Sequence, residues 1–433
     1  MPSECAPKWV AEAELDYNLP RDVDFKQCLK EKGLVAPDFA THVGGRKGNG
    51  DITERYHEVG AKVLPYVTYS NRFYIPEKEF EEDTWKFRAL TRPELFIYNE
   101  KSTRERSLFA DQKDHRRTEI CPNTQEMVEV AEQEVEELMR MGYDGFFVDH
   151  GFGPTKCHGE ALGIHRHIYH EEDIGDFPES YLRYSPGAVD APNDDPLGTY
   201  AYGMLLRQVQ KAMDRHGSEN ILILNTTYWP FYYSPEPFKK FVMYAPRNPR
   251  IIPGVIWESG HCMMVESHVC VPEWLIRPDS KEKTAMRWGN FALWHRLDET
   301  PKQHRDVGKR IVCLPGFGGS KLGDLREDAF YCYALGKMHN MIWNAHLGDP
   351  TEEFCRFKMG KPLEDECSSQ DGIYYRVFEK GAVAVNPDAM ERKTGLQVGV
   401  EKATDLFRGE PISCRSKVLD VTIPPEGGRV YLW

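Results

Sequence analysis

The sequence lacks the features that membrane, nucleic-acid-binding and disulfide-rich proteins require. None of its 433 residues lie in a run of 18 apolar residues, so no membrane-spanning helix is expected. The net charge of −13 argues against a nucleic-acid partner, because neutralising phosphates requires an excess of Lys and Arg. The 11 cysteines are odd in number and show no CxxC spacing, so a disulfide framework is not expected.

Several short motifs are also missing. The segment Met1–Val10 has no basic region followed by an apolar run, so no signal peptide is visible and the cytoplasm is the expected compartment. A secreted or periplasmic chain whose leader had been removed would look the same. There is no GxGxxG after the first strand, no GxxxxGK[ST] and no GxSxG, which argues against dinucleotide binding, a P-loop and a nucleophilic serine.

What the sequence does contain is an alternation of strand-like and helix-like segments. Several of the apolar runs are nearly continuous, as strands covered on both faces should be. The expected strands are Trp9–Leu15, Phe39–Val43, Lys62–Tyr69, Leu95–Tyr98, Gly145–Asp149, Asn220–Asn225, Phe241–Ala245, Gly254–Trp257 and Ile311–Phe317. The expected helices are Thr124–Met141 with Asn123 in a capping box, Tyr200–His216 ending at Gly217, and Lys283–Leu297.

This order predicts a (β/α)₈ TIM barrel over residues 1–350, in which residues 151–198 form a long functional loop. An open doubly wound sheet has the same order of elements, but the number of strands and the missing GxGxxG favour the barrel. From Asp371 onward the pattern changes to short strands and turns. Residues 351–433 are therefore expected to form a small antiparallel β domain of the sandwich type.

Two acids end apolar runs in the predicted barrel. Asp149 follows Phe146–Val148, and Glu258 follows Val255–Trp257. Active sites of such barrels lie at the carboxyl ends of the strands, and glycoside hydrolysis needs one carboxylate as nucleophile or base and one carboxylic acid. Trp257 could supply an apolar wall that raises the pKa of the acid, although ordinary packing explains it equally well.

At these residues the chain resembles a known group of proteins. The segments Ile120–Asn123 and Gly142–His150 are similar to those of glycoside hydrolase barrels related to the alpha-amylase, alpha-galactosidase and alpha-L-fucosidase superfamilies. The resemblance implies that Asp149 is the catalytic nucleophile and that the C-terminal strands form the β-sandwich that follows those barrels. Alpha-amylases place the partner acid one strand later, where this chain has Asn225. The acid is therefore expected to be Glu258 or, further along the chain, Glu266.

Other strand ends supply candidates for sugar binding. Arg247 could grip an acidic sugar, and Asn225 could hydrogen-bond a sugar hydroxyl. The full set of expected substrate-binding residues is Asp16, Tyr69, Arg72, His150, His165, Asn225, Arg247, Trp257 and Glu266.

Histidine and cysteine are concentrated just after Asp149. His150, Cys157, His158, Glu160, His165, His167 and His170 fall within one short segment. These are zinc-ligand types, but their spacing matches no recognised ligand set, so they are interpreted as pocket or surface residues and no metal or cofactor is expected.

The sequence thus predicts a glycosidase that acts on an oligo- or polysaccharide, with Asp149 and Glu258 as the catalytic pair. Two alternatives remain: a metal-dependent hydrolase or lyase that uses the Cys157–His170 loop, and a carbohydrate-binding barrel without catalysis. A carbohydrate is the only partner expected, and homo-oligomer formation is left open.

Overall fold

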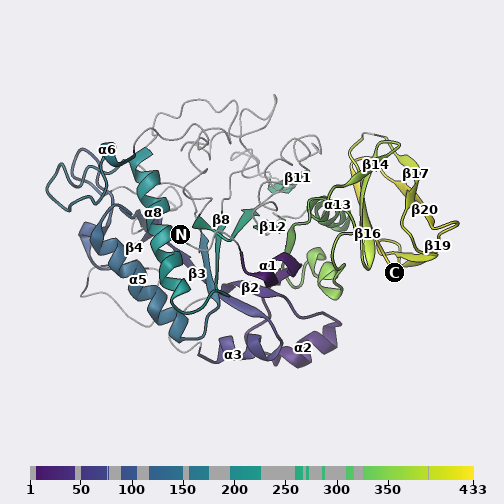
Figure 1. The fold of residues 1–433 in the computed structure, drawn as a ribbon, viewed down its shortest axis with the longest axis horizontal. Helices are drawn as coiled ribbons and strands as arrows, with labels where there is room; N and C mark the ends of the chain where they lie inside the picture. The colour runs from purple at the N-terminus through teal and green to yellow at the C-terminus, as the bar shows by residue number, and fades with distance from the viewer. Residues whose placement is uncertain are drawn as a thin grey trace. The chain divides into compact units, whose positions relative to one another are not determined.

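The fold is taken from a computed structural model, drawn in Figure 1. It describes residues 6–43, 50–75, 77, 89–104, 117–149, 156–174, 196–225, 259–266, 270–272, 285–287, 309–315, 325–388 and 390–433.

Eight strands close into a barrel in the order β1-β13-β12-β9-β8-β7-β3-β2, and their described pairings are parallel. The predicted (β/α)₈ fold is therefore confirmed. The barrel strands are β1 (Leu15–Tyr17), β2 (Phe39–Val43), β3 (Lys62–Thr68), β7 (Gly145–Asp149), β8 (Ile221–Asn225), β9 (Cys262–Glu266), β12 (Arg310–Leu314) and β13 (Ile342–Ala345).

The chain divides into two compact units, each made of several segments. The first comprises Met1–Pro7, Thr41–Glu58 and Lys62–Met264. In it, helices α5 (Gln125–Arg140) and α8 (Pro196–Asp214) pack side by side, as Figure 1 shows. The remaining elements of this unit are α3 (Gly50–Glu58), β4 (Asn71–Tyr74), β5 (Ala89–Leu90), η2 (Pro93–Leu95), β6 (Arg117–Glu119) and α6 (Glu171–Ile174).

The step from α5 to β7 follows from local chemistry. The apolar stripe of α5 (Met127, Ala131, Val135 and Leu138) is buried as predicted, and the Thr124 hydroxyl caps the helix by accepting from the Met127 N–H at 3.2 Å. Gly145 then begins β7 at φ +136°, where an added Cβ would lie 2.0 Å from the Ile221 carbonyl oxygen. Only glycine lets β7 approach β8 at this point.

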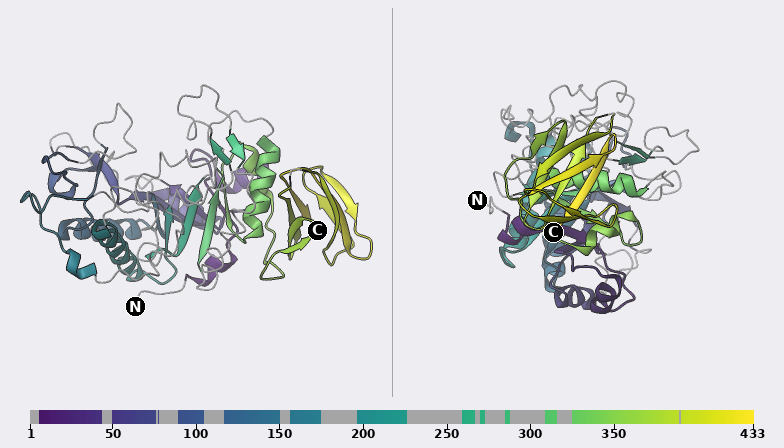
Figure 2. Two further views of the ribbon diagram at one scale, coloured as in Figure 1. Left: turned by 90° about the horizontal axis from the view of Figure 1, so that it is seen from above. Right: turned by 90° about the vertical axis from the view of Figure 1, so that its right-hand side faces the viewer.

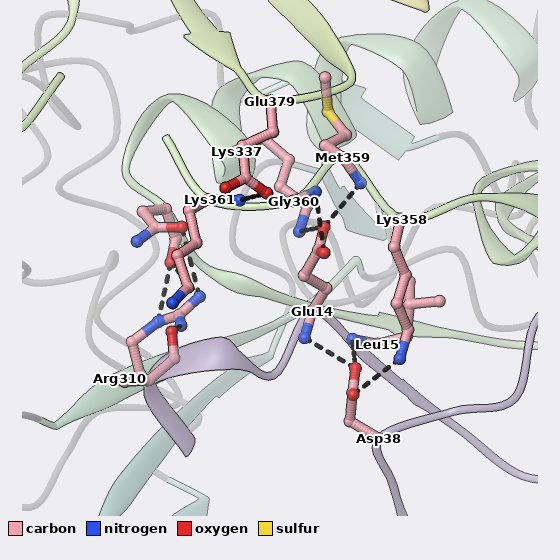
Figure 3. A network of polar contacts seen from close by, with 12 residues as sticks. Glu14, Leu15, Asp38, Arg310, Lys337, Lys358, Met359, Gly360, Lys361 and Glu379 are labelled. Carbon is pink, nitrogen blue, oxygen red and sulfur yellow. Dashed lines mark hydrogen bonds and ion pairs between the residues drawn. The ribbon is translucent and has the colours of Figure 1, made fainter. Parts of the chain in front are cut away.

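The second unit comprises Lys8–Ala40, Val59–Ala61 and Val265–Trp433. Figure 3 shows a polar network in it around Glu14, whose carboxylate accepts from the backbone N–H groups of Met359 at 2.8 Å and Gly360 at 3.0 Å. Lys337, which is almost fully buried, lies 3.5 Å from the same carboxylate. Burial, only partly offset by the charge of Glu14, lowers the pKa of Lys337. Elements of this unit not yet named are α1 (Lys8–Glu12), α2 (Phe25–Lys32), β10 (Cys270–Pro272), β11 (Ala285–Arg287), α13 (Leu325–Met338) and η5 (Pro350–Arg356).

The C-terminal strands of the second unit form antiparallel sheets, as predicted. One has six strands in the order β14-β15-β16-β21-β18-β19, and the other pairs β17 with β20. Helix α13 packs against β21 and β16, and Figure 2 shows it beside the yellow strands. The strands are β14 (Ser368–Gln370), β15 (Ile373–Phe378), β16 (Gly381–Asn386), β17 (Arg392–Gln397), β18 (Lys402–Asp405), β19 (Glu410–Ser413), β20 (Val418–Ile423) and β21 (Gly427–Leu432). The predicted boundary at residue 350 stays a prediction, because the two compact units are discontinuous along the chain.

Some predicted elements are wrong. Helix α1 occupies much of Trp9–Leu15, and η2 with two isolated bridges replaces the strand at Leu95–Tyr98. Within the expected helix Lys283–Leu297, the described residues Ala285–Arg287 pair with β10 as a strand. Tertiary pairing overrides local pattern in short segments of this kind. Strands β9 and β13 were not anticipated, and the expected strands Phe241–Ala245 and Gly254–Trp257 lie outside the described residues.

Within the described ranges, no helix combines the length and the apolar character needed to cross a bilayer. Nine cysteines in these ranges have free thiols: Cys28, Cys121, Cys157, Cys262, Cys313, Cys332, Cys355, Cys367 and Cys414.

Candidate active site

Asp149 is the last residue of β7, and all five residues of this strand are buried. Its two carboxylate oxygens accept hydrogen bonds from different neighbouring strands. The Tyr66 hydroxyl on β3 donates to Oδ2, and the Asn225 amide at the end of β8 donates to Oδ1 at 2.8 Å. The structure thus brings the predicted residues Asp149 and Asn225 together at the carboxyl ends of adjacent barrel strands. It adds Tyr66, which the sequence analysis placed inside a strand without assigning it a role.

A second tyrosine lies near this carboxylate. Tyr202 on α8 is fully buried, and its pKa is raised first by burial and then by the negative charge of Asp149. Its phenol therefore remains protonated at neutral pH. The two donors to Asp149, Tyr66 and Asn225, are thus uncharged, and so is the phenol of Tyr202.

The buried cation Arg72 is already paired. Arg72 on β4 donates from Nη1 and Nη2 to the two carboxylate oxygens of Glu134 on α5, the second bond measuring 2.7 Å. Its Nε donates to the Thr68 carbonyl at 2.8 Å, and its side chain is inaccessible to solvent. Arg72 was expected to bind substrate, but each of its guanidinium nitrogens is engaged within the protein.

Tyr69 follows β3 and was also expected to bind substrate. Arg72 lies over its ring, 5.3 Å from the ring centroid. Its buried hydroxyl has no hydrogen-bond partner among the described residues. Burial, followed by the charge of Glu134, raises the pKa of Tyr69 well above its ordinary value, so the hydroxyl keeps its proton.

The other expected site residues cannot be joined to Asp149 from the described part of the chain. Glu258, Trp257, Arg247 and His150 lie outside the described residues, and Glu266 is the last residue of β9. Asp16 on β1 belongs to the second compact unit, where it is buried and accepts from the Asn344 amide at 2.6 Å. The identity of the acid partner therefore stays a prediction.

A separate cluster in the first unit contains Cys121, Cys157, His165 and His167, whose ligand atoms all lie within 4.8 Å of one another. The hydrogen bond to Cys121 lowers the pKa of the Cys157 thiol most, and bonds to the two imidazoles add to the effect against the cost of burial. Burial lowers the pKa of His165, but its contact with Cys157 outweighs this and the net shift is upward. His165, which was expected to bind substrate, is thus placed in this cluster, and its substrate role stays a prediction. The concentration of His and Cys in the sequence points to the loop but not to Cys121, because that residue precedes α5 and no spacing rule links the two segments.

Comparisons with known proteins bear on the fold. No protein-family model matches the sequence, and no protein of curated function matches it. Among solved structures, the Ttha1563 protein of Thermus thermophilus aligns with a TM-score of 0.51 at 10% identity, over 98% of this chain and 99% of that one.

Two solved structures of glycoside hydrolases also align with the chain. A GH27 β-L-arabinopyranosidase from Geobacillus stearothermophilus aligns with a TM-score of 0.45 at 10% identity, over 98% and 97% of the two chains. A maltogenic alpha-amylase from Thermotoga neapolitana aligns with a TM-score of 0.47 at 10% identity, over 98% and 99%. Identity this low speaks to the arrangement of the chain and leaves the activity to be argued from the site.

Proposed function

We propose that the protein is a glycoside hydrolase that cleaves a glycosidic bond in an oligo- or polysaccharide, with Asp149 as nucleophile or base. The observation that supports this most directly is the position of Asp149. It ends a central barrel strand, where (β/α)₈ enzymes hold their catalytic groups. Both of its oxygens are oriented by donors from the flanking strands.

The donors suit the reaction because they carry no charge. An oxocarbenium-like transition state needs a full negative charge beside the anomeric carbon. Tyr66 and Asn225 can orient and stabilise the ionised carboxylate without neutralising it. The charge of the buried Arg72 is balanced by Glu134.

The second carboxyl group is proposed from the sequence. Glu258 would protonate the leaving oxygen, and Glu266 is the alternative. Arg72, which is paired with Glu134 and inaccessible to solvent, would stabilise the end of β3 through its bond to the Thr68 carbonyl. The proposed substrate contacts are Tyr69, His150, Asn225, Arg247 and Trp257.

The proposal predicts hydrolysis of aryl glycosides by the purified full-length chain. A panel that covers both anomers of common hexoses and pentoses should include at least one substrate from which the aryl alcohol is released well above the spontaneous rate. Release is measured by absorbance, and binding of the same sugars by calorimetry. If folded protein bound a sugar but hydrolysed none of the panel, the protein would be a carbohydrate-binding barrel and the proposal would be wrong.

The general acid can be identified from the dependence on the leaving group. Glu258→Gln should slow hydrolysis of a phenyl glycoside by about 10²-fold, because a poor leaving group needs protonation. A dinitrophenyl glycoside needs little such help and should keep nearly the normal kcat/KM, which reports only the step that releases the leaving group. Glu266→Gln is the matched variant. If it gave this pattern and Glu258→Gln did not, the acid would be Glu266.

A further inference from the structure

The four side chains of the Cys/His cluster come from two separate segments. Cys121 lies between β6 and α5, and the other three residues lie in the loop that follows β7. Cys121 is buried, whereas Cys157, His165 and His167 are partly exposed. Four atoms of the preferred zinc-ligand types therefore meet at one point, although the residues are scattered in the sequence.

Both imidazoles are oriented in the same way. His165 presents Nε2 to the Cys157 sulfur at 3.3 Å, and its Nδ1 bonds to the Glu94 carbonyl oxygen at 2.7 Å. His167 presents Nε2 to the Cys121 sulfur at 3.7 Å, and its Nδ1 lies 3.7 Å from the Glu160 carboxylate. Histidines that ligate metals are typically held in this manner, with the outer nitrogen directed at an oxygen.

The spacing of the atoms also fits a tetrahedral ion. Zinc bonds of about 2.3 Å to sulfur and about 2.0 Å to nitrogen separate neighbouring ligand atoms by about 3.5 Å. The two nitrogen-to-sulfur distances above lie on either side of that value.

The backbone near Cys157 is arranged to fit the cluster. The Gly159 N–H donates to the Cys157 sulfur at 3.4 Å, and a Cβ at Gly159 would lie 2.2 Å from Nε2 of His165. Glycine therefore leaves room for the imidazole.

The loop is anchored to the Cys121 segment by a second set of contacts. The Asn123 side chain donates to the Tyr169 carbonyl and accepts from the Tyr169 N–H, each at 2.8 Å. The Ile168 N–H donates to the Asn123 carbonyl at 3.0 Å. A pocket lined in part by Cys121, Cys157 and His167 adjoins the cluster and offers an ion a route to it. The site is thus held in shape by contacts that do not involve the four ligands.

We propose that Cys121, Cys157, His165 and His167 bind one Zn²⁺ ion in a structural site. Thiolate and imidazole ligands favour zinc over magnesium or calcium. Binding requires both sulfurs as thiolates and both imidazoles as neutral ligands, so the protons that these four groups carry would be released to solvent, with no redox change. The four protein ligands fill the tetrahedral shell and leave no position for substrate, so the ion would fasten the loop after β7 to the start of α5 rather than act as a catalyst. The proposal is independent of the glycosidase activity.

The first test measures zinc in the full-length chain, purified under reducing conditions from zinc-containing medium. Elemental analysis should find about one zinc ion per wild-type chain, and Cys157→Ser and His165→Ala should retain less than about a tenth of it. His158→Ala is the matched control, since His158 lies in the same loop but outside the cluster, and it should keep its zinc. A zinc-free wild type that takes up no added zinc would refute the site. So would equal loss in His158→Ala and His165→Ala, or a Cys121–Cys157 disulfide found by mass spectrometry in the wild-type chain.

The second test uses only the wild type, so it does not depend on how the variants fold. Replacement of the ion by Co²⁺ should give the strong visible bands of a tetrahedral ion and the near-ultraviolet bands of a cobalt–thiolate bond. A weak octahedral spectrum without the thiolate bands would contradict the site. Neither test measures hydrolysis, so a failure here is distinct from a failure of the proposed function.

Discussion

Replacement of Asp149 by Asn is expected to lower kcat for glycoside hydrolysis by about 10⁴-fold. The amide has nearly the same shape as the carboxylate but carries no charge, so it can neither attack the anomeric carbon nor activate water. About 5 kcal/mol of transition-state stabilisation would be lost. Substrate binding should change little, because the ground state does not depend on that charge to the same extent.

The matched control is Asp144→Asn, at the opposite end of the same strand. Asp144 accepts from the Val63 N–H at 2.9 Å and from the Lys62 ammonium at 2.8 Å, so its replacement should affect stability rather than kcat. Steady-state kinetics on the best aryl glycoside, with calorimetric titration of the same sugar, would measure both quantities. Near-normal kcat in Asp149→Asn, or equal losses in the two variants, would show that Asp149 is not the central group.

Local chemistry made some of this fold predictable. Strand β7 was predicted from the unbroken apolar run before Asp149, and helix α5 from its apolar stripe and N-terminal capping residues. Both patterns are local in the sequence, and both elements lie where expected. Strand β13 could not be predicted in this way, because its short apolar run is interrupted by the polar residue Asn344. Burial of this amide is compensated by its hydrogen bond to Asp16. Nothing near residue 344 in the sequence reveals a partner so far away.

The candidate site also contains residues that the sequence predicts and residues that it does not. Strand ends can be located from sequence, which brought Asp149 and Asn225 into consideration. The pairing of Arg72 with Glu134 could not be predicted. Glu134 lies on the buried face of α5, and in the sequence an acid at that position only interrupts the apolar stripe. Cys121 was missed for a related reason. Cys121 meets its three neighbours only because the loop after β7 comes back to it, with helix α5 and strand β7 in between. The path of a loop cannot be predicted from the sequence pattern.

Arg72→Met is expected to destabilise the protein by about 3–5 kcal/mol, the usual cost of removing one partner from a buried ion pair. The Glu134 carboxylate would lose both of its charged donors, and Thr68 would lose the donor to its carbonyl. The expected measurement is a clear shift of the urea unfolding transition to lower denaturant concentration. Arg392→Met is the matched control. Its partner Asp388 is substantially exposed, so the change should cost less than about 1 kcal/mol.

The double variant Arg72→Met/Glu134→Met identifies the source of this loss. If the cost arises from an unpaired buried charge, removing the second charge should restore much of the stability, because well-packed apolar side chains replace buried ion pairs at little cost. If Arg72 contributes only to stability and contacts no sugar, the double variant should also keep the wild-type KM. A double variant no more stable than Arg72→Met would contradict the ion-pair explanation. A raised KM together with restored stability would instead place Arg72 in contact with the sugar, as the sequence first suggested.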